Sequence, residues 1–141
     1  MSKTNTTTIS VEATVNAPVD KIWQYWTGSE HITKWNSASP DWHTPKAENV
    51  VKVGGRFNIR MEAKDGSMGF DFAGTYDTVD PHKHIAYTID DGRKVNTTFE
   101  PEGEGIKIVT TFEAETKNSI EMQRGGWQAI LDSFRNYTET N

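Results

Sequence analysis

The sequence has 141 residues and a formal net charge of −5, and its length suits one domain spanning residues 1–141. It contains no cysteine, which excludes disulfides and thiolate metal sites, and its 15 basic residues form no cluster, which argues against binding to nucleic acid. No apolar run approaches the roughly 20 residues of a membrane span, and residues 1–10 lack the apolar segment of a secretory signal, so we expect a cytoplasmic protein with no membrane span.

The N-terminal part of the chain predicts a strand followed by a short helix. Residues 1–7 are polar, and we expect them to be disordered. Residues 8–16 alternate between apolar and polar side chains, which is typical of a half-buried strand. A helix is predicted over residues 18–26, because Pro18 suits its first turn and Asn16 can cap it.

Most of the tryptophans lie in one short stretch that holds a second predicted helix, over residues 29–35, and a predicted loop over residues 36–48. They are Trp23, Trp26, Trp35 and Trp42. The first two fall at helical spacing, which indicates that they belong to the core. The last two either pack in the core as well or line the entrance of a cavity, and the sequence leaves both interpretations open.

The middle of the chain predicts five further strands separated by turns. In chain order their sequences are GGRFNIRMEA, GFDFAGTYDTV, HIAYTID, KVNTTFE and IKIVTTFEAE. Each alternates between apolar and polar residues, and the Asp-Gly pairs in KDGS and DDGR are typical of hairpin turns. The pattern predicts an antiparallel meander with one buried face and one solvent-exposed face.

A long helix is predicted over residues 118–137, where the hydrophobic period becomes helical and Asn118 or Ser119 can cap the start. Its apolar stripe comprises Ile120, Trp127, Ile130, Leu131 and Phe134. Gly125 and Gly126 lie in its interior, where each is less favourable than alanine by roughly 1 kcal/mol. We expect a close approach of the helix to the sheet to explain them, so that Gly125→Leu destabilises far more than Gly125→Ala.

The order of these elements predicts an α+β fold in which a curved antiparallel sheet is covered by one long helix. From about residue 9 to residue 139, the chain resembles the START-like superfamily (SRPBCC, Bet v 1-like), and within it the branch related to the C-terminal domain of the activator of heat-shock protein 90 ATPase. Five segments carry the resemblance. They are APVDKIWQYWTGSEHITKW, VGGRFNIRM, GTYDTVDPHKHIAYT, VNTTFEPEGEGIKIVTTFEA and GGWQAILDSFRNYTE. The resemblance implies a helix-grip fold, with six to seven strands wrapped around the C-terminal helix and two short helices after the first strand.

The resemblance also implies a cavity between the C-terminal helix and the sheet, in place of a solid core. Members of the branch often carry a Trp-Trp pair where this chain has Trp35 and Asn36, which makes this part of the wall more polar or more open. The candidate ligand-binding residues are Trp35, Trp42, Phe57, Ile59, Met61, Phe70, Phe72, Tyr76, Tyr87, Thr97, Phe99, Gln123, Trp127 and Leu131. The two tyrosines, Thr97 and Gln123 would supply the few polar groups that such a pocket needs. No inward basic residue is expected, which disfavours a strongly anionic ligand.

Two groups of residues are candidate chemical sites. His82 and His84 would share one strand face if the strand began early enough, but a zinc site needs further ligands and turn histidines are commoner. Asp41 and His43 could form an acid/base pair beside the cavity, or simply be solvated in a loop. No nucleophile motif is visible. We therefore assign no catalytic residue, no metal ligand and no cofactor.

Three functions are compatible with these observations. The first is binding of a small hydrophobic or aromatic ligand of lipid-like, polyketide or flavonoid-like type. The second is a chaperone-regulator-like interaction protein in a stress response, acting on a chaperone or another protein. The third is a cyclase- or hydrolase-like enzyme, for which no convincing acid/base pair is visible. A cavity larger than about 300 Å³ favours the first, and an exposed apolar patch of more than a few hundred Å² favours the second. We expect a monomer or a weak homodimer.

Overall fold

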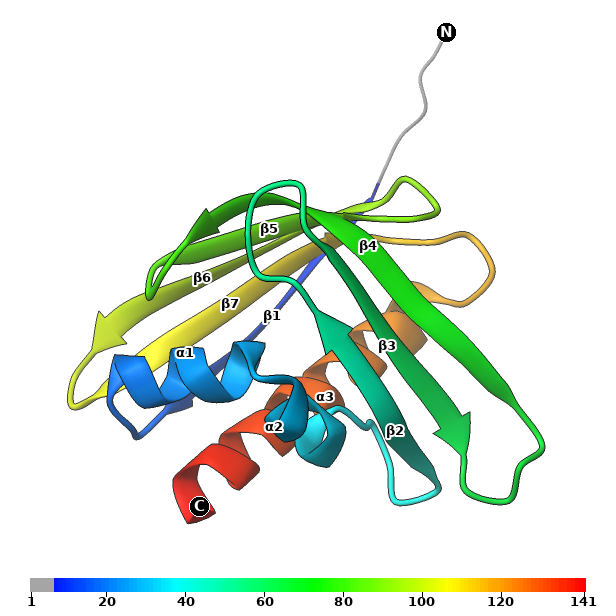
Figure 1. Ribbon diagram of the computed structural model, residues 1–141, viewed down its shortest axis with the longest axis horizontal. Helices are drawn as coiled ribbons and strands as arrows, with labels where there is room; N and C mark the ends of the chain where they lie inside the picture. The colour runs from blue at the N-terminus through cyan, green and yellow to red at the C-terminus, as the bar shows by residue number, and fades with distance from the viewer. Residues whose placement is uncertain (1–6) are drawn as a thin grey trace, which may run out of the picture.

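The computed structural model describes residues 7–141 and shows a curled antiparallel sheet with one long helix on its concave side (Figure 1). The elements are β1 (Thr8–Val15), α1 (Val19–Thr27), α2 (Ser29–Trp35), β2 (Trp42–Asn49), β3 (Arg56–Ala63), β4 (Gly69–Asp80), β5 (His84–Ile89), β6 (Lys94–Glu102), β7 (Gly105–Glu113) and α3 (Ile120–Thr140). The predicted disorder of residues 1–7 falls outside the described residues except at Thr7. The carbonyl of Thr7 accepts a hydrogen bond from the backbone of Ala114 at 2.8 Å, so this residue already belongs to the sheet.

The seven strands form one sheet in the order β1-β7-β6-β5-β4-β3-β2, and all neighbours are antiparallel. The alternation in the sequence corresponds to the two faces of this sheet. In β6, for example, Val95, Thr97 and Phe99 are buried, while Lys94 and Asn96, which flank Val95, are exposed. The curled sheet, the long C-terminal helix and the two short helices after β1 confirm the predicted helix-grip arrangement.

The predicted loop over residues 36–48 is wrong from Trp42 onward, because Trp42–Asn49 forms the edge strand β2. The prolines of this segment argued against a strand. Pro45, however, lies where the pairing of β2 with β3 shifts register, between His43 and Lys46. Proline is tolerated at such irregularities of edge strands because no ladder hydrogen bond is needed from its nitrogen. The extra strand brings the sheet to the upper end of the predicted range.

The two short helices lie where the sequence predicts them, within one residue for α1 and as predicted for α2. The predicted cap is wrong. Pro18 occupies the N-cap position of α1 and gives no side-chain capping bond. The backbone nitrogen of Asn16 instead donates to the Glu139 carboxylate at 2.8 Å, which ties the entry of α1 to the end of α3.

The long helix α3 begins at the predicted place, because the Ser119 hydroxyl accepts a hydrogen bond from the Met122 backbone nitrogen at 3.1 Å. The predicted reason for its two interior glycines is wrong. A Cβ atom built at Gly125 or at Gly126 would meet no atom within 4 Å. Neither glycine is therefore required for close packing of α3 on the sheet.

We expect Gly125→Ala to raise the free energy of unfolding by about 0.5–1 kcal/mol, because alanine has the higher helix propensity and the added methyl group enters open space. Gly125→Leu is expected to be tolerated nearly as well. Urea denaturation of the three proteins measures both changes. Gly66→Ala serves as the control that should destabilise, because Gly66 has φ +80°. A lower stability of Gly125→Ala would contradict the open environment of this position.

The core is strongest where α1, α2 and α3 meet one end of the sheet. Trp26 stacks on Trp35 with 5.3 Å between ring centroids, and Phe134 of α3 presents its edge to both rings at 4.9 Å. Trp23 packs edge-on against Phe99 of β6 at 5.6 Å. Trp23 and Trp26 thus pack against the core as predicted. This aromatic cluster fills the space between the helices and the sheet at one end of the molecule.

Candidate ligand-binding cavity

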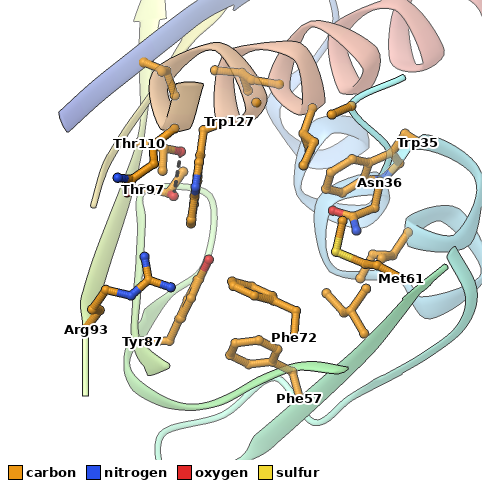
Figure 2. A pocket seen from close by; sticks show the side chains of 18 of the residues that line it. Trp35, Asn36, Phe57, Met61, Phe72, Tyr87, Arg93, Thr97, Thr110 and Trp127 are labelled. Atoms are coloured by element: carbon orange, nitrogen blue, oxygen red, sulfur yellow. Dashed lines mark hydrogen bonds between the residues drawn. The ribbon is translucent and has the colours of Figure 1, made fainter. Parts of the chain in front are cut away.

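A cavity of about 410 Å³ lies between α3 and the concave face of the sheet (Figure 2). The strands provide most of its wall, α3 covers it, and α1, α2 and the segment after α2 close one side. This volume exceeds the value of about 300 Å³ above which a small-molecule site is favoured over a filled core. Residues from all seven strands and all three helices line this one space. The strands can converge on it only because the sheet is curled.

The floor of the cavity is a group of aromatic rings around Phe57 of β3. Its ring centroid lies 4.7 Å from that of Tyr87, 5.4 Å from that of Tyr76 and 5.7 Å from that of Phe72. Gly74 of β4 makes this arrangement possible. A Cβ atom there would lie 2.9 Å from the Phe57 ring and 2.5 Å from a backbone carbonyl of β5. The missing side chain therefore provides room for the Phe57 ring.

Trp127 forms the opposite side of the cavity. Its indole projects from α3 (Figure 2) and stacks on Phe112 of β7, with centroids 4.0 Å apart and an angle of 11° between the ring planes. Its edge faces Phe72 at 6.1 Å. Aromatic surfaces that face one another across a void are complementary to a flat apolar molecule, because aromatic rings favour offset and edge-to-face contacts.

Most of the residues predicted to bind a ligand line this cavity. They are Trp35, Phe57, Ile59, Met61, Phe70, Phe72, Tyr76, Tyr87, Thr97, Gln123, Trp127 and Leu131. Their contact with a ligand stays a prediction. Trp35 is a buried part of the wall and not a lid, since it is only 5 % exposed and its indole nitrogen donates to the Tyr25 carbonyl at 2.9 Å.

Two of the predicted residues, Trp42 and Phe99, do not line the cavity. Trp42 instead borders a separate open groove of about 550 Å³ on the outside of α3, close to Pro40 and Asp132. Phe99 lies beyond the end of the cavity, where it packs against Trp23 and Trp26. For Phe99 the alternation assigned the correct strand face, but the curl of the sheet decides which part of that face borders the void. For Trp42 the predicted loop was wrong, so its predicted place at the cavity entrance was wrong as well.

Several polar groups of the wall are already engaged. The Gln123 amide accepts from the Glu115 backbone nitrogen at 2.9 Å and donates to the Asn118 carbonyl at 2.9 Å, so it braces the loop before α3. The Tyr76 hydroxyl donates to the Asn49 side chain, and burial raises the pKa of Tyr76 to about 12. The donors of these two side chains are thus used within the protein, and their contact with a ligand stays a prediction.

The structure adds a basic residue that the sequence-based prediction missed. Arg93 lines the cavity, with its Nε atom 2.8 Å from the Asp91 carboxylate. The expectation of no inward basic residue is therefore wrong. A signal was present, because Val95 and Thr97 point inward and the strand period of two residues carries back to Arg93. It was missed because Arg93 directly follows an Asp-Gly turn and was treated as part of the turn.

The candidate chemical sites outside the cavity are not assembled. His82 lies in the turn before β5 with φ 70°, whereas His84 is the first residue of β5, so the two do not share a strand face. The nearest acidic partner of His43 is Glu62 at 3.8 Å and not Asp41. Within residues 7–141, no group of three or more histidine, cysteine, aspartate or glutamate residues could hold a metal ion.

In the same part of the chain, no helix has the length and hydrophobicity needed to cross a bilayer.

Comparisons with known proteins find a matching family and solved structures with the same fold. Residues 16–139 match the family described as Activator of Hsp90 ATPase homolog 1-like protein. The solution structure of an AHSA1-like protein from Aeromonas hydrophila is 42% identical and has a TM-score of 0.89, covering 95% of this chain and 93% of that one. The protein Chr148 from Cytophaga hutchinsonii is 53% identical with a TM-score of 0.82, covering 94% and 92%. CV1439 from Chromobacterium violaceum, at 21% identity, a TM-score of 0.85 and coverage of 95% and 98%, shares the fold. None of the curated proteins matches the chain.

Proposed function

We propose, since the chain belongs to the Activator of Hsp90 ATPase homolog 1-like family, that it binds a small, flat and mostly apolar molecule between α3 and the sheet. The observation that carries this proposal is the cavity of about 410 Å³ in a region where the sequence has enough aromatic residues for a solid core. Lipid-like, polyketide and flavonoid-like compounds have the required shape and polarity.

The glycine at position 126 supports the same proposal. Gly126 lines the cavity, and a Cβ atom built there would meet no atom within 4 Å. A glycine in the middle of a helix lowers stability by roughly 1 kcal/mol relative to alanine. Gly126 is not needed for close packing, but the absence of a side chain there keeps space open above the aromatic floor. This is expected if a ligand occupies that space.

Burial of apolar surface would drive the binding. At about 25 cal/mol per Å², a ligand that buries about 300 Å² gains roughly 7 kcal/mol, from which the loss of its translational and rotational freedom is subtracted. We therefore expect affinities no tighter than about micromolar for simple aromatic probes. No cofactor is needed for this function.

The proposal is tested by native mass spectrometry of freshly purified protein and by NMR titration with a flavone, dodecanoic acid and ATP. We expect a co-purified small molecule, or saturable amide shifts in residues 70–76 and 123–131 with the first or the second compound. ATP is the control and should give none, because its triphosphate would have to be buried beside the aromatic floor. Absence of saturable shifts with every compound would refute the proposal.

Binding of a protein partner, such as a chaperone, is the second candidate. It is favoured by two apolar side chains of the cavity wall that also reach the surface, Phe70 at 48 % and Met122 at 67 % exposed. Both face solvent where a partner could cover them. Addition of a chaperone to the titration distinguishes the candidates. Amide shifts at Phe70 and Met122 with the chaperone, and no saturable shifts with the small molecules, would favour this alternative over a ligand in the cavity.

A further inference from the structure

One end of the cavity is polar, and the side chains that gather there are hydrogen-bond donors. Figure 2 shows Arg93 and Tyr87 at this end, below Thr97 and Thr110, whose hydroxyls bond to each other at 2.9 Å. The Arg93 side chain is only 22 % exposed, so its guanidinium is largely withdrawn from water. A charged group in such a place needs nearby hydrogen-bond partners.

The protein satisfies only part of the Arg93 guanidinium. Its Nε atom donates to Asp91 at 2.8 Å, and its Nη1 atom donates to the Glu113 carbonyl at 3.3 Å. A guanidinium carries five N–H groups. Within residues 7–141, the Nη2 atom has no hydrogen-bond partner, so this residue of the cavity wall retains free donors.

Tyr87 offers a second donor at the same end. Its hydroxyl points into the cavity (Figure 2) and has no hydrogen-bond partner among the described residues. Burial raises the pKa of Tyr87 above its ordinary value, and the charge of Arg93 offsets only a smaller part of this shift. The phenol therefore stays protonated at physiological pH and can donate its proton to an oxygen in the cavity.

The charges around this end disfavour a fully ionised ligand. Asp91 already neutralises Arg93, and the Glu115 carboxylate also borders the cavity. Hydrogen bonds from the Asn118 backbone and side chain lower the pKa of Glu115, so it stays ionised. A ligand carboxylate would add another negative charge. An ammonium would face the positive charge of Arg93, and the Glu115 oxygens that could accept from it already accept from Lys117 and Asn118.

From these contacts we infer that the polar end of the cavity takes an uncharged carbonyl oxygen conjugated to an aromatic ring system, which accepts hydrogen bonds from Arg93 and Tyr87. The ring system would lie against the aromatic side chains that line the cavity, among them Trp127 and Phe72. This inference rests on the proposed function and specifies the ligand class, namely aryl ketones and related neutral carbonyl compounds.

The test compares three probes of nearly equal size by calorimetric or NMR titration of the full chain, namely 2-acetylnaphthalene, 2-ethylnaphthalene and 2-naphthoate. We expect the ketone to bind about 10- to 100-fold more tightly than the ethyl compound, as hydrogen bonds from a charged donor allow. Equal binding of these two would overturn the inference and leave the proposed function intact. Tighter binding of 2-naphthoate than of the ketone would also overturn the inference, because it would mean that the polar end prefers an anion to a neutral carbonyl group. Failure of all three to bind would refute the proposed function itself.

Variants assign the preference to its residues. Arg93→Met and Tyr87→Phe should each reduce the ratio of the affinities for the ketone and the ethyl compound. With Arg93→Met the two affinities should become about equal. The affinity for 2-ethylnaphthalene itself should change little in either variant. Arg93→Lys, which retains a charged donor, is measured beside them because Arg93 also holds Asp91. It should keep part of the preference. Arg60→Met is the matched control, since Arg60 pairs with Glu62 on the outer face, and it should leave all three affinities unchanged. A preference for the ketone that survives both Arg93→Met and Tyr87→Phe would contradict the assignment, and amide spectra report whether each variant is folded.

Discussion

Phe134→Ala is expected to lower the free energy of unfolding by about 3–5 kcal/mol, the usual range for removing a buried phenylalanine. Phe134 is completely buried and touches Trp26 and Trp35 edge-on at 4.9 Å each. These rings connect α3 to α1 and α2, so the truncation removes contacts to both short helices at once. Since domains are stable by only about 5–15 kcal/mol, the loss is a large part of the total.

The measurement is chemical denaturation followed by tryptophan fluorescence, with Phe70→Ala as the matched control. Phe70 is 48 % exposed, so its truncation should change stability by less than about 1 kcal/mol. Similar losses in the two variants would mean that the aromatic cluster at the end of α3 is not the main link between the helices and the sheet.

Gly126→Leu is expected to abolish ligand binding while leaving the protein folded and at least as stable as the wild type. Leucine has a helix propensity close to that of alanine, so the helix gains roughly 0.5–1 kcal/mol. The new side chain would extend into the cavity, because Gly126 lines it and its Cβ position is free of contacts. Affinity for 2-acetylnaphthalene should fall at least about tenfold, since the ring system and the leucine would compete for one volume.

Gly125→Leu is the matched control for this prediction. It adds the same side chain one residue earlier in α3, where it faces solvent, so it should leave affinity unchanged. Calorimetric titration and thermal unfolding of both variants check the two halves of the prediction. If Gly126→Leu binds with wild-type affinity, the binding site must lie outside the cavity. A marked loss of stability in this variant would show that the space above Gly126 is not free.

Local patterns predicted much of the fold. The alternation around Thr97 assigned the buried face of β6, and the Ser119 cap marked the start of α3 to within two residues. The edge strand β2 was missed because its signals are weak. Its proline and polar residues resemble a loop, and only pairing with β3 makes Trp42–Asn49 a strand. Propensity is a weak guide at sheet edges, where tertiary pairing outweighs it.

The candidate site shows the same division. The sequence by itself determined the two-residue and helical periods, the hairpin turns and the Ser119 cap, and hence most of the side chains that point inward, because these depend on neighbours only a few positions apart. Only the tertiary structure decided that this inward face encloses a cavity, that Phe99 lies beyond it and Trp42 outside it, and that Gly126 borders it while Gly125 faces solvent. Whether an apolar row fills a core or lines a void depends on the curl of seven strands and the distance of α3 from them. These are long-range properties of the packed chain, and no local pattern encodes them.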